Sequence, residues 1–323
     1  MRRVQLLRFL QALQVIARLR YENQESSSLN EITTLLNAHI AREEGQWWIQ
    51  LMLNRMKDIA KTIEECNLCK VEREVILFGR NFDVKWKEWQ SAVSQDLLTS
   101  KREEWWAVHQ FLFCNHRVYK RFYNIVKEEE YIRPTFVAKS LGLKSIEHHP
   151  TVDVLKEWGL KLGRLQRNTL TGLYYVLREP NLEGYPSLQD FGLTLCEAYV
   201  KIQKEERQHV VSLPKVQELV CQHFRIKRSN FSSLLEKLHQ ENLGSIFLES
   251  GIIPSYAYGS IEERKQILKL DAIQSQLWFE TRFFYTKEDW EDIEIDNQVK
   301  RFIRTTDDLL MRFGIDAKRV NTP

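Results

Sequence analysis

SLPKVQELVCQHFRIKRSNFSSLLEKLHQENLGSIFLESGII, residues 212–253, carries the clearest succession of structural signals in the chain. Ser212 is a typical N-cap residue, and Pro214 falls near the first helical position, where its missing N–H costs nothing. Apolar residues then recur at helical spacing as far as Phe224. This part of the stretch therefore predicts a helix that begins after Ser212 and ends near Phe224.

A charged turn and a second helix are predicted next. The segment 225–230 has few apolar residues, so we expect an exposed cationic turn that ends in a helix cap at Ser229 or Asn230. Apolar side chains from Phe231 to Leu238 would form the inner face of the second helix. Gly244 would end this helix, and the apolar residues on both sides of Ser250–Gly251 predict a hairpin of two strands, the second containing Ile252 and Ile253.

The order of helix, turn, helix and hairpin resembles the winged-helix family, a helix-turn-helix variant with a β-hairpin wing. The resemblance implies that the second helix enters the major groove and that the wing contacts phosphate or the minor groove. Base edges are recognised by hydrogen bonds and phosphates by charge. Two sets of candidate residues follow, Ser232, Ser233 and Lys237 for bases, and Arg225, Lys227 and Arg228 for phosphates. A solvated or protein-docking face is the open alternative.

A weaker version of the same order is expected in residues 1–80. A helical apolar stripe runs from Leu6 to Ala17, and a loop with a helix cap is expected at 25–28. A short helix around Ile32–Leu36 and a long helix containing Trp48, Met52 and Ile63 would follow. Two strands around Glu72–Arg73–Glu74 would complete this N-terminal helical, winged-helix-like module.

Residues 81–180 predict a helical connector followed by another winged-helix-like module. After aromatic helices up to Cys114, we expect helices around 119–130, 134–142 and 152–159, the last two ending at Gly142 and Gly159. Strands over 160–165 and 173–177 would form a wing. The wing would carry Lys161, Arg164 and Arg167, and cations on a wing release counterions when they meet a phosphate backbone. A solvated basic hairpin is the alternative.

The remaining segments complete a mostly α fold with small β-hairpins and two or three winged-helix-like modules joined by helices. Residues 181–187 read as a linker, because Gly184 and Pro186 lie close together. Residues 187–256 form the third module with its leading helix. Residues 257–323 form a C-terminal helical segment with an acidic run, and one or two final helices are expected between Val299 and Phe313.

Charge and cysteine content restrict the partners and the location. The net charge is only +3, so nucleic-acid binding would have to come from local patches. Five cysteines, an odd number, without a secretory signal fit a reducing, cytoplasmic environment. No stretch approaches the ~20 apolar residues that a membrane span needs, so we expect no membrane partner.

No arrangement of residues predicts catalysis, a metal or a cofactor. Cys66-x-x-Cys69 could bind zinc only with Cys114 and His116, or with His148 and His149, and a complete ligand set at a recognisable spacing is missing. We therefore interpret the two residues as ordinary thiols. Acidic side chains between Asp289 and Asp296 could bind the metal of a nuclease, but no paired Lys or His accompanies them.

The sequence thus favours a non-enzymatic nucleic-acid-binding protein, with DNA or a nucleoprotein as its partner. Tandem modules would raise affinity through effective concentration. A regulator, a replication protein or a component of a mobile element or defence system would fit. The alternatives are a scaffold subunit of a larger complex whose modules dock protein partners or self-associate and, less favoured, a metal-dependent nuclease.

Overall fold

The computed structural model of the chain describes residues 4–44, 51–92, 102–129, 131–178, 186–207, 209–250, 293–295, 298–300 and 302–315. It divides into two compact units, Met1–Leu165 and Gln166–Pro323. The division falls inside the module predicted for residues 81–180. The described residues are mostly helical with small antiparallel sheets, which confirms this part of the predicted fold class.

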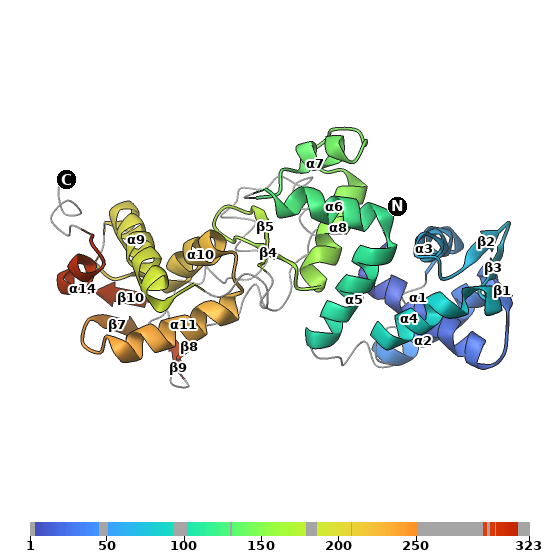
Figure 1. Cartoon of the computed structure of the whole chain (residues 1–323), viewed down its shortest axis with the longest axis horizontal. Coiled ribbons are helices and arrows are strands. Elements are labelled where there is room, and N and C mark those ends of the chain that lie inside the picture. Colours follow the sequence, from blue (N-terminus) through green and yellow to red (C-terminus); the bar gives the residue numbers. More distant parts are fainter. Residues whose placement is uncertain are drawn as a thin grey trace. The chain divides into compact units, whose positions relative to one another are not determined.

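The first unit begins with a helix, a strand, two helices and two further strands (Figure 1). The third strand lies between the other two and is antiparallel to both, with Ile76 opposite Ser27 on one side and Val71 on the other. These elements are α1 (Leu6–Tyr21), β1 (Ser26–Ser28), α2 (Leu29–Glu44), α3 (Leu53–Glu65), β2 (Lys70–Glu72) and β3 (Val75–Leu77).

Three details of this region differ from prediction. Residues 26–28 form strand β1 as well as the expected cap, in which the backbone N–H of Glu31 donates to Ser28 Oγ at 3.1 Å. Helix α2 spans 16 residues and is therefore not short. Met52 precedes α3 and is 76% exposed, so it does not belong to the buried stripe, whereas Ile63 does. Trp48 lies outside the described residues.

The remaining described elements of the first unit are helices, and Trp158 in the last complete helix contacts the beginning of the chain and the beginning of α6 (Arg117–Lys127). The indole Nε1 of Trp158 donates to the carbonyl oxygen of Val4 at 2.8 Å, and its ring centroid lies 5.4 Å from that of Phe9. The helix that contains Trp158 is therefore held against the beginning of the chain by a hydrogen bond and an aromatic contact. The elements are η1 (Arg80–Phe82), α4 (Asp83–Ala92), α5 (Arg102–Asn115), α6 (Arg117–Lys127), α7 (Pro134–Ser140) and α8 (Pro150–Lys161).

In the first unit, two glycines were expected to end helices, and one does. Gly142 follows the C-cap of α7 with φ +76°, a conformation that favours glycine. Gly159 instead lies inside α8, which continues to Lys161. A Cβ atom at position 159 would lie 2.5 Å from the side chain of Leu165, so glycine is required there by close packing.

Within its described residues, the second unit contains two small two-stranded sheets, three long helices, a three-stranded sheet and a short helix near the end of the chain (Figure 1). Strand β4 begins at the last residue of the first unit. The elements are β4 (Leu165–Arg167), β5 (Tyr174–Val176), α9 (Leu188–Glu206), β6 (Val211–Ser212), α10 (Leu213–Phe224), α11 (Arg228–Glu241), β7 (Ile246–Glu249), β8 (Ile293–Ile295), β9 (Gln298–Lys300), β10 (Phe302–Thr305) and α14 (Asp307–Arg312).

The sheet of the second unit has the order β6-β10-β7, with Ile303 opposite Val211 on one side and Leu248 on the other. The expected helix around residues 299–303 is therefore wrong. Burial alternates along β10, where Ile303 is buried and Arg304 exposed, which is the period of a strand. The predicted partner strand of β7, around Ile252, lies outside the described residues, as does the linker at 181–185.

The described part of the second unit resembles the first in the order of its sheet-forming elements. In both, a helix, a strand, two helices and a strand follow in order, and a later strand, β3 or β10, takes the middle position of the sheet. Two residues separate β2 from β3, whereas residues 250–301 separate β7 from β10. The core of the second unit includes Phe191 and Phe231, whose ring centroids are 5.5 Å apart, and Ile293 and Ile295 of β8.

Within the part of the chain that is described, no helix combines the length and the apolar character that crossing a membrane would require.

A buried histidine lies in the aromatic core of the first unit. His109 is 1% exposed; its Nδ1 lies 2.9 Å from the hydroxyl oxygen of Tyr119, and its ring centroid lies 4.9 Å from that of Tyr123. Burial lowers the pKa of His109 to about 3, and the nearby charge of Arg164 acts in the same direction. His109 is therefore a neutral core histidine.

His109 should make the protein less stable as the pH falls. Its pKa in the folded state lies below the ordinary value of 6.5, so the unfolded chain binds a proton first and stability is lost from about pH 6.5 downward. Between pH 6 and pH 4.5 this loss is about 2 kcal/mol, at about 1.4 kcal/mol per pH unit. In urea unfolding, His109→Gln should lose correspondingly less unfolding free energy than the wild type between about pH 6 and about pH 4.5. The exposed control His223→Gln should lose as much as the wild type. An equal loss in His109→Gln and the wild type would contradict the assignment.

Candidate nucleic-acid interface

The connection between α10 and α11 is shorter than predicted. Arg225 ends α10 in the left-handed conformation, with φ 56°, and its N–H is bonded back to the last turn. Ile226 is buried and holds the connection against the core, and Lys227 is the N-cap of α11. The predicted cap at Ser229 or Asn230 is therefore wrong, because both residues already belong to the helix.

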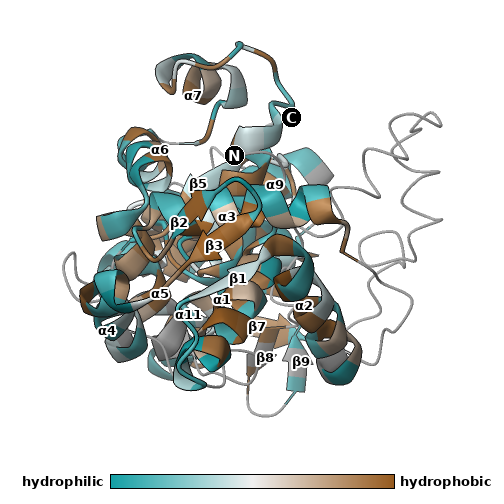
Figure 2. Cartoon of the chain, turned by 90° about the vertical axis from the view of Figure 1, so that its right-hand side faces the viewer, coloured by the Kyte–Doolittle hydropathy of each residue, from teal (hydrophilic) through white to brown (hydrophobic). Residues whose placement is uncertain are grey.

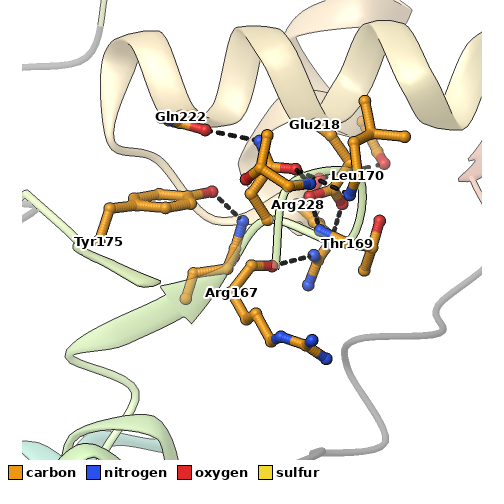
Figure 3. A network of polar contacts seen from close by, with 11 residues as sticks. Arg167, Thr169, Leu170, Tyr175, Glu218, Gln222 and Arg228 are labelled. Atoms are coloured by element: carbon orange, nitrogen blue, oxygen red, sulfur yellow. Dashed lines mark hydrogen bonds and ion pairs between the residues drawn. The ribbon is translucent and has the colours of Figure 1, made fainter. Parts of the chain in front are cut away.

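Arg228 is not part of an exposed turn. It is 5% exposed, and its Nε donates to Glu218 Oε1 at 2.6 Å, while an Nη atom donates to the carbonyl oxygen of Arg167 at 2.7 Å (Figure 3). Both side chains of the ion pair are almost completely covered. The expected exposure of Arg228 to phosphate is thus contradicted, because its guanidinium is used inside the unit.

The same network fixes the loop between β4 and β5 (Figure 3). The second carboxylate oxygen of Glu218 accepts the backbone N–H of Thr169 at 2.9 Å. The side-chain amide of Asn168 donates to Gln222, and its oxygen accepts the backbone N–H of Leu170 at 2.8 Å. The loop is therefore bonded to α10 by both side-chain and backbone groups.

Of the three cations predicted for a wing, only Arg167 lies on the hairpin. Its guanidinium is 5.8 Å from the ring centroid of Tyr174. Arg164 precedes the hairpin, is 3% exposed, and its guanidinium lies over the ring of Trp106, so its predicted exposure is wrong. Lys161 is the last residue of α8 and forms a 3.0 Å ion pair with Glu157. The strand starts at 165, later than predicted, which explains the difference.

The outer face of α11 is exposed, as the sequence predicted. Ser233 and Lys237 are exposed, Ser232 is half-buried, and Phe231 and Leu235 face the core. The hydroxyl group of Ser233 donates to the carbonyl oxygen of Ser229 at 3.2 Å, and that of Ser232 makes the same kind of bond to Arg228. A hydroxyl that donates in this way still offers acceptor lone pairs to a ligand.

A cation that sequence reasoning missed lies beside the beginning of α11. Arg178 is exposed, and its backbone N–H donates to the carbonyl oxygen of Arg225 at 2.8 Å. Forty-seven positions separate the two residues, and no local pattern in the sequence indicates this contact. We call Arg178, Arg225, Lys227, Ser233 and Lys237 the α11 surface.

Three of the residues considered for zinc lie in environments that disfavour metal binding. Cys66 and Cys69 are buried, and burial raises the pKa of both thiols, which disfavours the thiolate that zinc binds. His116 uses both ring nitrogens, because Nδ1 accepts the N–H of Tyr119 at 3.0 Å and Nε2 lies 2.9 Å from Glu65. Within the described ranges, no three His, Cys, Asp or Glu side chains are grouped to hold a metal. Most of the acidic run at 289–296 lies outside those ranges.

Comparisons with protein-family models, with curated proteins and with solved structures found no match to this chain.

The buried ion pair should respond strongly to the loss of one partner. Arg228→Leu leaves the carboxylate of Glu218 buried without its counter-charge, which costs about 3–5 kcal/mol of unfolding free energy. Adding Glu218→Gln removes the charge but keeps an acceptor for Thr169, so the double variant should recover much of the loss. Denaturant unfolding followed by helical circular dichroism measures both effects.

The exposed residue Lys237 provides the control for this pair. Lys237→Leu should change the unfolding free energy by no more than about 0.5 kcal/mol, as is usual for surface substitutions. The structural role of the ion pair is refuted if Arg228→Leu and Lys237→Leu have the same unfolding free energy.

Proposed function

We propose that this chain is a non-enzymatic nucleic-acid-binding protein built from winged-helix modules, with duplex DNA as the favoured partner. The element order supports this, because each unit contains three helices followed by two strands that pair with each other, β2 with β3 and β7 with β10, the second pair being separated by residues 250–301. The helices α6, α7 and α8, followed by β4 and β5, have the same order along the chain. This is the order that the winged-helix resemblance implies.

The exposed outer face of α11 is the observation that carries the proposal. This helix follows a helix and a short turn, its inner side is buried, and Ser233 and Lys237 lie on its outside. A helix of this kind fits the major groove of B-DNA, where hydroxyl and ammonium groups can bond to base edges. In helix-turn-helix proteins the beginning of this helix approaches the bases.

The beginning of α11 is suited to phosphate. The positive end of the helix dipole lies there, together with Arg225, Lys227 and Arg178. These groups would hold the phosphate backbone and set the position of the helix, while Ser233 and Lys237 would contribute limited base reading. Arg228 takes a different role from the predicted one, because it positions α11 from inside the unit.

A protein-docking role is the second candidate for the hairpin of the first unit. Glu72 and Glu74 flank Arg73 at its tip, and Glu74 forms a 2.8 Å ion pair with Lys57. Glu72 also pairs with Lys70 at 2.6 Å, so the charges of this hairpin are largely balanced and it suits a protein partner better than DNA. The two roles are compatible with a protein that acts in a nucleoprotein complex. We also propose a cytoplasmic location, because the cysteines are free thiols and four of them are buried.

The α11 surface should contribute to salt-dependent binding of DNA. Each lost phosphate contact makes the slope of log K against log salt shallower by about 0.9. Arg225→Ala with Lys237→Ala should therefore reduce the slope by up to about 1.8 on a 30-base-pair duplex, measured by fluorescence anisotropy between about 50 and 200 mM salt.

A matched control is available on α9, where Lys201 and Lys204 are exposed. Lys201→Ala with Lys204→Ala removes the same charge and should keep the wild-type slope. Equal slopes for all three proteins reject the α11 surface as the DNA contact. Purification with a stoichiometric protein partner after nuclease treatment, together with no retention on DNA, would favour the scaffold alternative.

A further inference from the structure

Helix α6 presents a cationic face that the proposed function does not use. Its sequence is RVYKRFYNIVK, and the first and last residues, Arg117 and Lys127, are about 15 Å apart along the axis at 1.5 Å per residue. Spacings of 3, 4, 7 and 10 residues from Arg117 keep the exposed side chains on one side of the helix. The exposed residues are Arg117, Lys120, Arg121, Asn124 and Lys127, which we call the α6 surface.

The opposite side of α6 is completely used in the core of the first unit. Tyr119, Phe122, Tyr123 and Val126 are all buried. Figure 2 shows the resulting alternation of hydrophilic and hydrophobic colouring along the helix. The N-cap His116 bonds the N–H of Tyr119 and fixes the beginning of the helix. The cationic row is therefore held on a rigid element.

The row of cations is unfavourable for the helix itself. Arg117 lies three residues before Lys120 and four before Arg121, and like charges at these spacings destabilise a helix. Arg117 also lies at the positive end of the helix dipole, and no acidic residue occurs in the first turn. A local arrangement that costs stability is expected where a function requires it.

The acidic residues nearest to α6 in the sequence lie after its end and are partly engaged. Glu128 is exposed, and Glu129 pairs with Arg133. At the other end, Glu65 is directed to the buried ring of His116, whose hydrogen bond lowers the pKa of that carboxyl group. The helix itself contains no carboxylate.

The chemistry of the α6 surface favours a phosphate backbone. Lys and Arg side chains donate hydrogen bonds and accept none, and Asn124 can also donate. A membrane-binding helix would need an apolar face for the lipid, but that face is buried here. Single strands usually stack on exposed aromatic rings, and the aromatic residues of α6 are buried. Protein interfaces rely on aromatic anchors, which the α6 surface also lacks.

We propose that the α6 surface docks the phosphate backbone of double-stranded nucleic acid without reading its sequence. A rigid, straight row of cations suits a ligand whose charge repeats regularly along a stiff axis. The α6 surface and the α11 surface are proposed to bind the same class of ligand, but they have no residue in common. Either assignment can therefore fail without the other.

The test compares full-length variants on duplex DNA. The α6 variant combines Arg117→Gln, Lys120→Gln and Lys127→Gln, and it retains Arg121 because that guanidinium donates to the carbonyl oxygen of Ser140. The slope of log K against log salt should become shallower by about 2.7. The affinity should fall by the same factor on duplexes of different sequence. The thermal midpoint should stay close to that of the wild type, because Arg117→Gln and Lys120→Gln remove like-charge repulsion while Lys127→Gln removes a cation that is favourable in the last turn.

The control variant removes three exposed cations elsewhere, by Arg80→Gln, Lys201→Gln and Lys204→Gln, and should keep the wild-type slope. The proposal is overturned if the α6 variant keeps the wild-type slope of log K against log salt. It is also overturned if the control variant changes this slope as much as the α6 variant does. The proposal is also overturned if the chain binds a single-stranded oligonucleotide, phosphatidylserine vesicles or polyglutamate at least as tightly as the duplex and the α6 variant weakens that binding.

The α11 variant, Arg225→Ala with Lys237→Ala, separates the two proposals when it is measured in the same series. A shallower slope in the α6 variant alone keeps the α6 surface and rejects the α11 surface. A shallower slope in the α11 variant alone rejects the α6 surface. Failure of the wild-type chain to bind any duplex rejects both.

Discussion

The buried ion pair between Glu218 and Arg228 is the constraint on which the arrangement of the second unit depends. Removing two opposite charges from water is costly, and the cost is offset only when the remaining hydrogen-bonding groups also find partners. Here they do, because Arg228 also donates to the carbonyl oxygen of Arg167 and Glu218 also accepts the N–H of Thr169. Three segments that are distant in the sequence are therefore held in one geometry, and a shift of any of them would leave a buried charge without its partner.

Arginine serves opposite purposes at positions 228 and 117, and the neighbouring core decides which. Arg228 lies on the inner side of α11 beside an acidic side chain from α10, so its charge is balanced by an ion pair inside the protein. In α6 the inner positions hold residues such as Tyr119 and Phe122, which offer no counter-charge, and Arg117 remains outside. Counting basic residues in a segment therefore does not measure its attraction for phosphate, since only cations on the outer side of an element contribute to the field that a ligand meets.

The sequence predicts the elements that have a local period and fails where the cause is remote. The helices around Leu6, Val216 and Phe231 were found from their apolar spacing, and the exposure of Ser233 and Lys237 followed from it. Strands β1 and β10 were missed because their partners lie far along the chain. Arg164 and Arg228 were placed outside because arginine is rarely buried, and their partners are set by tertiary packing. The cations of α6 are visible in the sequence, but a binding role for them follows only once the structure shows them together on one exposed side of the helix.

The near balance of charge in this chain makes local separation of charge the property that decides binding. With 47 basic and 44 acidic residues, the whole molecule attracts a polyanion only weakly from a distance. At contact, however, the Debye length of about 8–10 Å confines the interaction to nearby groups. Helix α6 offers four cations without an acid of its own, whereas in the hairpin of β2 and β3 Glu72 pairs with Lys70 and Glu74 with Lys57, so the charges there are nearly balanced. A polyanion is therefore attracted over this short range to the helix and not to the hairpin, so the pairing of acids with bases contributes to orientation as well as the exposed cations do.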